Sequence, residues 1–170
     1  MKRMLATVAV AGLVGAAAAL GAQQSGFLLL PRAAPAGQMT LYGHIKSLKR
    51  VGSGYRLRFD PAWFTSGITA NAAAYEDGVI GKGEVMPNDN YTRDESHKTL
   101  LYKVSPTAQV TVLVNQGTKG INATPISVAE LALIVAGKKT AHTLFESLDS
   151  GVWIRVRIDT VNSLDQQYHP

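Results

Sequence analysis

The sequence contains no cysteine, and this absence removes several kinds of chemistry at once. Disulfide bridges, thiolate metal sites and a cysteine nucleophile are all excluded. A lipid-modified cysteine is excluded as well, so the chain cannot be a bacterial lipoprotein. A folded domain must therefore be held together by its hydrophobic core, which is feasible for a chain of 170 residues.

Histidine is also scarce, and the four that are present stand far apart in the sequence. No two of them have the four-residue spacing of helical zinc ligands. The glycines on either side of Ser53 lack the strand and helix of a hydrolase nucleophile elbow, and those around Lys82 lack the spacing of a phosphate-binding loop. We therefore expect a domain that is not an enzyme, and no catalytic residue can be named.

The longest uncharged run of the sequence lies near the N-terminus. Lys2 and Arg3 precede residues 4–22, which carry no charge and are more than half alanine and glycine. This order is typical of an export signal or a membrane anchor, and the small residues at its end suit a signal peptidase. We predict a signal peptide over residues 1–22, with an uncleaved N-terminal membrane anchor as the alternative, and a linker over residues 23–38.

This leader predicts a secreted protein or one held at the outer face of the cytoplasmic membrane. Only the N-terminal segment would then contact the membrane, and only if it is retained. After residue 22 the chain holds 15 basic and 12 acidic residues, a net charge of +3. Such a mild excess is more typical of a soluble surface than of a nucleic-acid interface, so we expect no nucleic-acid partner.

Residues 39–170 predict a single globular domain that is mainly β with minor α. The glycines of residues 51–54 indicate a tight turn, and Tyr55, Leu57 and Phe59 alternate with polar residues as in a half-buried strand. The same alternation makes residues 152–159 the clearest strand, with Ile158 on its inner face. The strands predicted in this way are 40–48, 55–60, 99–104, 109–115, 152–159 and 161–168, with residues 140–148 extended.

Helix signals are fewer. Ser127 and Glu130 form a capping box that predicts a helix over residues 128–136. Asp60 followed by proline predicts a short helical turn through Phe64, and an alanine-rich helix follows over residues 68–75. This set of elements favours a small antiparallel β-barrel of the OB type with one capped helix near residues 128–136. A β-sandwich is the alternative.

Basic residues alternate on two of the predicted strands. Arg56 and Arg58 face outward on the first, and Trp153, Arg155 and Arg157 face outward on the other. If these strands are neighbours, they form a basic face with an aromatic side chain, which suits phosphates or anionic envelope polymers. A polar face that prevents edge-to-edge aggregation is the alternative interpretation. We predict a non-enzymatic binding module for an anionic envelope component or a protein partner.

The most polar stretch, residues 79–98, predicts a long loop and a second candidate binding site. The residues proposed for this loop site are Asn88, Asp89, Asn90, Tyr91, Arg93 and Asp94. Carboxylates on residues 76–98 suggest two further functions, a hydrolase or a calcium-binding secreted domain, because calcium prefers oxygen ligands. No EF-hand spacing is present, so no metal ligand can be named and no cofactor other than calcium is considered.

Part of the chain between residues 55 and 115 resembles small exported proteins of Gram-positive bacteria for which no activity is known. The residues that carry this resemblance are Phe59-Asp-Pro-Ala62, Gly67 to Ala74, Glu76-Asp-Gly78, Pro87-Asn-Asp89, Tyr91 and Arg93. The resemblance implies a bacterial exported domain. It implies no activity and assigns no residue a role.

Overall fold

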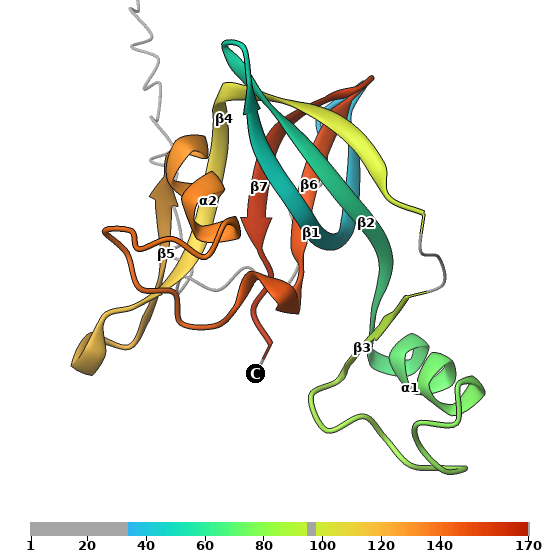
Figure 1. Cartoon of the computed structure of the whole chain (residues 1–170). Helices are drawn as coiled ribbons and strands as arrows, with labels where there is room; N and C mark the ends of the chain where they lie inside the picture. Colours follow the sequence, from blue (N-terminus) through green and yellow to red (C-terminus); the bar gives the residue numbers. More distant parts are fainter. Residues whose placement is uncertain (1–33, 95–97, 170) are drawn as a thin grey trace, which may run out of the picture.

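The computed structural model describes residues 34–94 and 98–169 (Figure 1). The predicted leader over residues 1–22 and most of the linker lie outside these ranges. The described part is mainly β, as predicted. Its strands are β1 (Met39–Val51), β2 (Gly54–Ser66), β3 (Asn90–Arg93), β4 (Leu100–Asn115), β5 (Ile121–Ile126), β6 (Val152–Arg157) and β7 (Thr160–Gln166). Its helices are α1 (Gly67–Glu76), α2 (Val128–Val135) and the short 3-10 helices η1 (Gly117–Lys119) and η2 (Leu148–Ser150).

Five of these strands close into a barrel. β1 pairs with β2, β2 with β4, β4 with β7, β7 with β6, and β6 pairs back with β1. This order, with α2 before the fourth barrel strand, is the OB-like architecture that we predicted, and closure excludes the β-sandwich. One detail of the prediction is wrong, because β4 and β7 run parallel while the other barrel pairs are antiparallel.

The hairpin of β1 and β2 forms as the sequence predicts. Gly52 has a φ of 60° in the turn, a conformation that glycine adopts without steric cost. Beyond the turn, Leu57 and Phe59 are fully buried, while Arg56 and Arg58 point to the outside of the barrel. Val152, Ile154 and Val156 of β6 complete this core as predicted.

Helix α2 also forms where its capping box predicts. The backbone N–H of Glu130 donates to the Ser127 hydroxyl at 3.1 Å, and Val128 and Leu131 are buried in the barrel core. The carboxylate of Glu130 does not return to the Ser127 amide. It contacts Nδ1 of His142 at 2.8 Å instead, which ties the helix to the segment after it.

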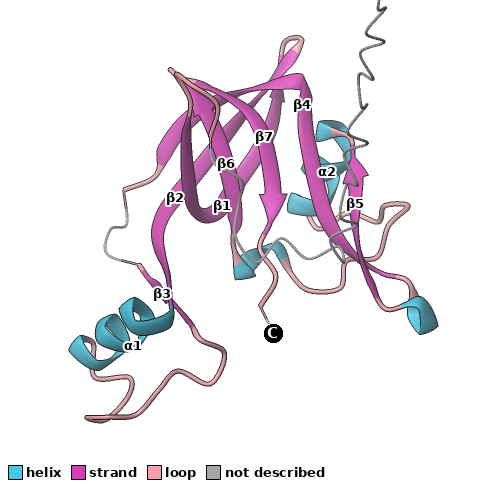
Figure 2. Cartoon of the chain, turned by 180° about the vertical axis from the view of Figure 1, so that it is seen from behind, coloured by secondary structure: helices cyan, strands magenta, loops and turns pink. Residues whose placement is uncertain are grey.

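The predicted helical turn from Asp60 to Phe64 is wrong, because these residues continue strand β2 as far as Ser66. Pro61 pairs with Gly43 of β1, and a side chain at Gly43 would overlap the Asp60 carbonyl. Cross-strand pairing with β1 thus overrides the local helix signal. The end of β2 leaves the barrel and pairs with β3, and α1 follows it. We call residues 61–94 the arm (Figures 1 and 2).

Several boundaries differ from the predictions for non-local reasons. The two strands predicted over 99–104 and 109–115 are the single strand β4, since β7 pairs with both halves. Strand β5 lies where we predicted neither a strand nor a helix, and β3 lies within the long loop predicted over residues 79–98. Within residues 140–148, which were predicted to be extended, Leu144 forms an isolated bridge and Leu148 begins the 3-10 helix η2. Ile158 is 91% exposed, because it lies in the turn after β6 with a φ of 59°.

Candidate functional site

Exposed basic side chains form a band around the outside of the barrel. Lys49 of β1 pairs with Arg56 of β2, and Arg56 pairs with Lys103 of β4. The band continues across β7, where Thr160 pairs with both Lys103 and Arg157 of β6. Register partners point to the same side of a sheet, so these residues line one path. We call Lys49, Arg56, Lys103 and Arg157 the basic row.

The part of the basic row that lies on β1 and β2 has little negative charge nearby. Among the described residues, Lys49 and Arg56 have no carboxylate within ion-pair distance. Lys103 does have one, since its Nζ lies 2.7 Å from Oδ2 of Asp159. The hydrogen bond from Lys103 lowers the pKa of Asp159 below its ordinary value, so this pair stays charged at neutral pH. Excess positive charge therefore remains in the row.

A shallow depression lies beside the basic row. It has a volume of about 410 Å³ and is lined by Lys49, Arg56 and Arg58 together with the apolar side chains of Val51 and Leu101. Arg58 is held by a hydrogen bond from Nη2 to the Thr99 hydroxyl at 3.1 Å. The depression thus presents cations and exposed apolar surface side by side.

The structure separates the predicted basic face into two parts. Arg56, Arg58 and Arg157 belong to or adjoin the basic row, but Arg155 pairs with Thr40 at the opposite end of β1 from Lys49. Arg155 is half-buried and lies near Asp165. Burial raises the pKa of Asp165, and Thr111 and then Arg155 lower it to a smaller extent. Trp153, predicted as an exposed aromatic, is half-buried in an aromatic cluster.

That cluster borders a pocket that the sequence did not predict. The pocket has a volume of about 320 Å³, and its aromatic walls are Tyr42, Trp63, Phe64 and Trp153. Ring centroids of Tyr42 and Trp153 are 5.0 Å apart, and those of Tyr42 and Phe64 are 5.1 Å apart. Trp63 and Phe64 lie in the segment that was predicted as a helical turn. Because of that prediction, these two residues were not assigned to a strand.

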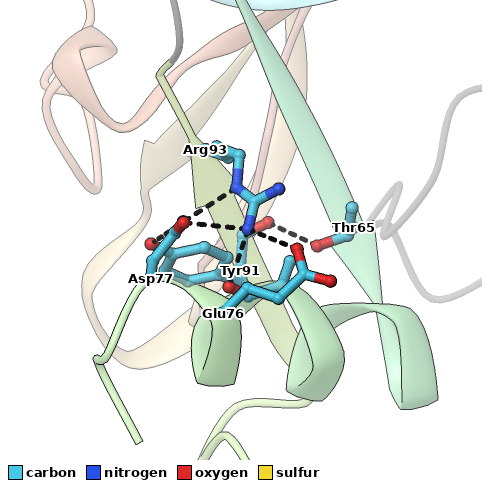
Figure 3. A network of polar contacts seen from close by, with 6 residues as sticks. Thr65, Glu76, Asp77, Tyr91 and Arg93 are labelled. Carbon is cyan, nitrogen blue, oxygen red and sulfur yellow. Dashed lines mark hydrogen bonds and ion pairs between the residues drawn. The ribbon is translucent and has the colours of Figure 1, made fainter.

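The residues of the predicted loop site are mostly occupied in holding the arm together (Figure 3). Arg93 donates to both carboxylate oxygens of Asp77 at 2.8 and 2.9 Å, to Glu76 at 3.1 Å and to the Ala73 carbonyl at 2.9 Å. The Tyr91 hydroxyl donates to Asp77 at 2.9 Å. Hydrogen bonds from Arg93 and then Tyr91 lower the pKa of Asp77. This network fastens α1 onto β3.

The remaining loop residues shape the chain rather than converge on one point. Asp89 adopts a φ of 53°, and its carbonyl accepts from the Gly67 amide at 3.0 Å. The Asn90 side chain donates to the Asn88 carbonyl at 2.8 Å, and Asp94 is exposed. Within residues 34–94 and 98–169, no group of three or more acidic or histidine side chains is placed to hold a metal ion. Calcium binding stays a prediction without a structural site.

One carboxylate is buried at the junction of the barrel and the arm. Asp60 is 4% exposed, and its Oδ2 lies 2.9 Å from Nζ of Lys46. Its Oδ1 has no hydrogen-bond partner among the described residues. His44 is its register partner on β1, and the His44 Nδ1 lies 3.0 Å from the Asp149 carbonyl. This arrangement anchors the base of the arm.

Comparisons with protein-family models, curated proteins and solved structures found no match to this chain. In the part of the chain that the structure describes, no helix has both the length and the apolar character needed to cross a bilayer. Within the described residues, the basic row and the aromatic pocket are the surfaces whose geometry suits a ligand.

Proposed function

We propose that the chain is an exported, non-enzymatic binding module whose basic row binds an anionic polymer of the cell envelope. The observation that carries this proposal is the register of Lys49, Arg56 and Lys103 on three adjacent strands. Like charges placed directly opposite each other destabilise a sheet. Placing these three cations side by side therefore destabilises the free protein, and a bound anion offsets that effect.

The position of the row within the barrel supports the same function. β2 and β4 are the second and third barrel strands, and the face formed by these strands is where OB folds bind oligonucleotides and oligosaccharides. The turns after β1 and β6 border this face, as do the binding loops of that fold. The analogy with that fold concerns the same face of the barrel on which the cations lie.

The spacing of the cations favours an extended ligand. Adjacent strands are about 4.8 Å apart, so the row presents positive charge at intervals of about 5 to 10 Å around the barrel. Repeated phosphates or carboxylates along a polymer match such intervals, and the arginine guanidinium can bind either group through two hydrogen bonds. Exposed Leu101 and Val51 beside the row provide contact surface for the uncharged backbone of the polymer.

The distribution of charge over the chain further restricts where an anion binds. Residues 67–94 of the arm hold five acidic and two basic residues, whereas the barrel strands carry the basic excess. The arm therefore repels the same polymer that the basic row attracts. A polyanion is directed to the barrel and away from the arm.

The test is a binding assay with the purified chain and four defined polyanions. These are polygalacturonate, poly-L-glutamate, vesicles of phosphatidylglycerol in phosphatidylcholine, and oligothymidylate, each measured at several salt concentrations. Arg56→Ala with Lys103→Ala removes two members of the row. Arg50→Ala with Lys138→Ala removes the same charge from exposed positions outside the row and serves as the matched control.

We expect polygalacturonate to bind with a salt-dependent affinity that falls about tenfold in the row variant and changes little in the control. An equal loss of affinity in both variants would show that net charge alone determines binding, and it would contradict the proposal. Preferred binding to oligothymidylate or to vesicles would replace the envelope polymer by a nucleic acid or a lipid surface.

A further inference from the structure

The aromatic pocket described above lies apart from the basic row. It is formed where β1, β2 and β6 meet at the base of the arm, and both tryptophans of the chain line it. Tyr42 pairs with Ala62 on one side and with Trp153 on the other. Lys49 and Arg56 pair several residues further along the same hairpin, toward its turn. The pocket and the middle of the row are thus separate surfaces.

Two walls of the pocket, Tyr42 and Trp153, are fixed in place. The Tyr42 hydroxyl donates to the Ser150 carbonyl at 2.7 Å, and Nε1 of Trp153 donates to the Gln167 side chain at 2.5 Å. Gly151 makes room for this arrangement, because any Cβ there would overlap the Tyr42 ring. Side chains held by packing and hydrogen bonds lose little entropy when a ligand arrives. This side of the pocket is therefore preorganised.

Two observations indicate that the pocket binds a ligand. Trp63 is 63% exposed, although indole is among the side chains that gain most from leaving water. Thr40 also lines the pocket, and its hydroxyl is buried without a hydrogen-bond partner among the described residues. An unpaired buried hydroxyl is unfavourable. A ligand with one apolar face and several hydroxyl groups would cover the indole of Trp63 and form a hydrogen bond with the Thr40 hydroxyl.

We propose that this pocket is a subsite for one sugar ring of a glycan. Pyranose rings have an apolar face of C–H groups that stacks on the negative face of an aromatic ring, and equatorial hydroxyls at their edges. No lining residue is charged, so the subsite selects a neutral ring rather than a phosphate or carboxylate. Its volume of about 320 Å³ lies at the low end of ligand sites and suits one or two rings.

The position of the subsite also suggests the path of a longer ligand over the surface of the barrel. Trp153, Arg155 and Arg157 alternate along β6 and therefore share its outer face. A glycan that leaves the pocket along β6 meets Arg155 first and then the end of the basic row at Arg157. This extension rests on the proposed function and makes the envelope polymer an anionic glycan. The subsite itself does not depend on it.

Intrinsic fluorescence provides a direct test, because both tryptophans report on the pocket. The purified chain is titrated with neutral tetramers of N-acetylglucosamine, glucose, galactose and mannose, and tryptophan emission is recorded. The same titrations are made with Trp63→Ala and, as a conservative variant, Trp63→Phe. Tyr75→Ala removes another exposed aromatic, on α1 and outside the pocket, and is the matched control.

We expect at least one tetramer to change the emission in a saturable way. Trp63→Ala should weaken its affinity about tenfold, as followed by calorimetry, while Trp63→Phe retains most of it and Tyr75→Ala all of it. Arg56→Ala with Lys103→Ala should leave this neutral binding unchanged, which separates the subsite from the basic row.

Three results would overturn the subsite. The first is the absence of any saturable change with all four tetramers. The second is equal binding by the wild type and Trp63→Ala. The third is a self-association, seen by light scattering, that Trp63→Ala abolishes, because the pocket would then be an interface between two copies of the chain.

Discussion

Arg56 and Lys103 are direct register partners on β2 and β4, and Lys49 faces Arg56 from the other side. Arg56 is thus the centre of three cations on one antiparallel sheet. Cross-strand pairs of like charge are unfavourable by up to about 1 kcal/mol, and pairs of opposite charge are favourable by a similar amount. Stability and anion binding should therefore respond to this residue in opposite directions.

Replacing Arg56 by glutamate should stabilise the protein while weakening anion binding. The carboxylate would lie between Lys49 and Lys103, so we expect the free energy of unfolding to rise by up to about 1 kcal/mol at low salt. Urea denaturation at low and at high salt measures the gain, which should shrink as salt is added. Binding to polygalacturonate should fall in parallel.

The control for this prediction is Arg50→Glu on the same hairpin. Arg50 is exposed but pairs with Tyr55 instead of a cation, so reversal of its charge changes the net charge equally without relieving the row. A stability gain of the same size in both variants would show that total charge, and not the register of Arg56, is responsible.

Removing Arg93 should loosen the arm without opening the barrel. Arg93→Ala loses the hydrogen bonds to Asp77, Glu76 and the Ala73 carbonyl that hold α1 against β3. Hydrogen exchange should become faster at the amides of α1 and stay unchanged at those of β6. Uniformly faster exchange through both elements would mean that the arm and the barrel unfold as one unit.

The same network makes the arm sensitive to acid. Arg93 and Tyr91 hold the pKa of Asp77 below its ordinary value of 3.8. A carboxyl whose pKa is lowered by folding contributes stability that is present above its unfolded pKa and is lost as pH falls through the folded pKa. Exchange at α1 in the wild type should therefore accelerate below about pH 4, and Arg93→Ala should lack most of this dependence.

Lys46→Ala should destabilise the fold through the carboxylate it leaves behind. Asp60 is 4% exposed, and Lys46 is its ion-pair partner. Leaving a buried polar group unpaired costs about 1 to 3 kcal/mol, so the free energy of unfolding should fall by that amount. Combining Lys46→Ala with Asp60→Asn should recover part of the loss. Strictly additive effects in this double-mutant cycle would show that the two side chains do not interact energetically.

Asp165→Asn should stabilise the protein at neutral pH. Burial raises the pKa of Asp165 above its ordinary value of 3.8, with smaller opposing effects from Thr111 and Arg155. The folded state then holds the proton more tightly than the unfolded state, so stability is lost as pH rises through the folded pKa. The difference in melting temperature between variant and wild type should grow from pH 3 to pH 7. A constant difference would exclude titration of Asp165 as its cause.

Local sequence patterns predicted much of the fold. The alternation of Leu57 and Phe59 with arginines, the similar pattern of β6, and the Ser127 cap each report on contacts within a few residues. The Asp60-Pro61 signal failed because pairing with Gly43, seventeen or more residues away, decides the conformation there. The prediction that Ile158 faces inward was wrong because the turn between β6 and β7 begins at Ile158, one residue earlier than the apolar character of this residue suggests.

The candidate site was only partly predictable for the same reason. Outward alternation identified Arg56, Arg58 and Arg157, but their neighbours in the basic row are fixed by β4 and β7, whose parallel pairing no short pattern encodes. The aromatic pocket joins Tyr42, Trp63 and Trp153, which are far apart in the sequence. The geometry of this pocket depends on barrel closure, and short sequence patterns do not predict such contacts between distant residues.

The position of β7 between β4 and β6 also determines when the barrel can close during folding. β7 follows every other barrel strand in the sequence, yet it lies between β4 and β6 and joins them. A chain that emerges N-terminus first, from a ribosome or through a translocation pore, therefore cannot seal its core until residues 160–166 have arrived. The barrel of such a chain closes only after β7 has emerged and has paired with both β4 and β6.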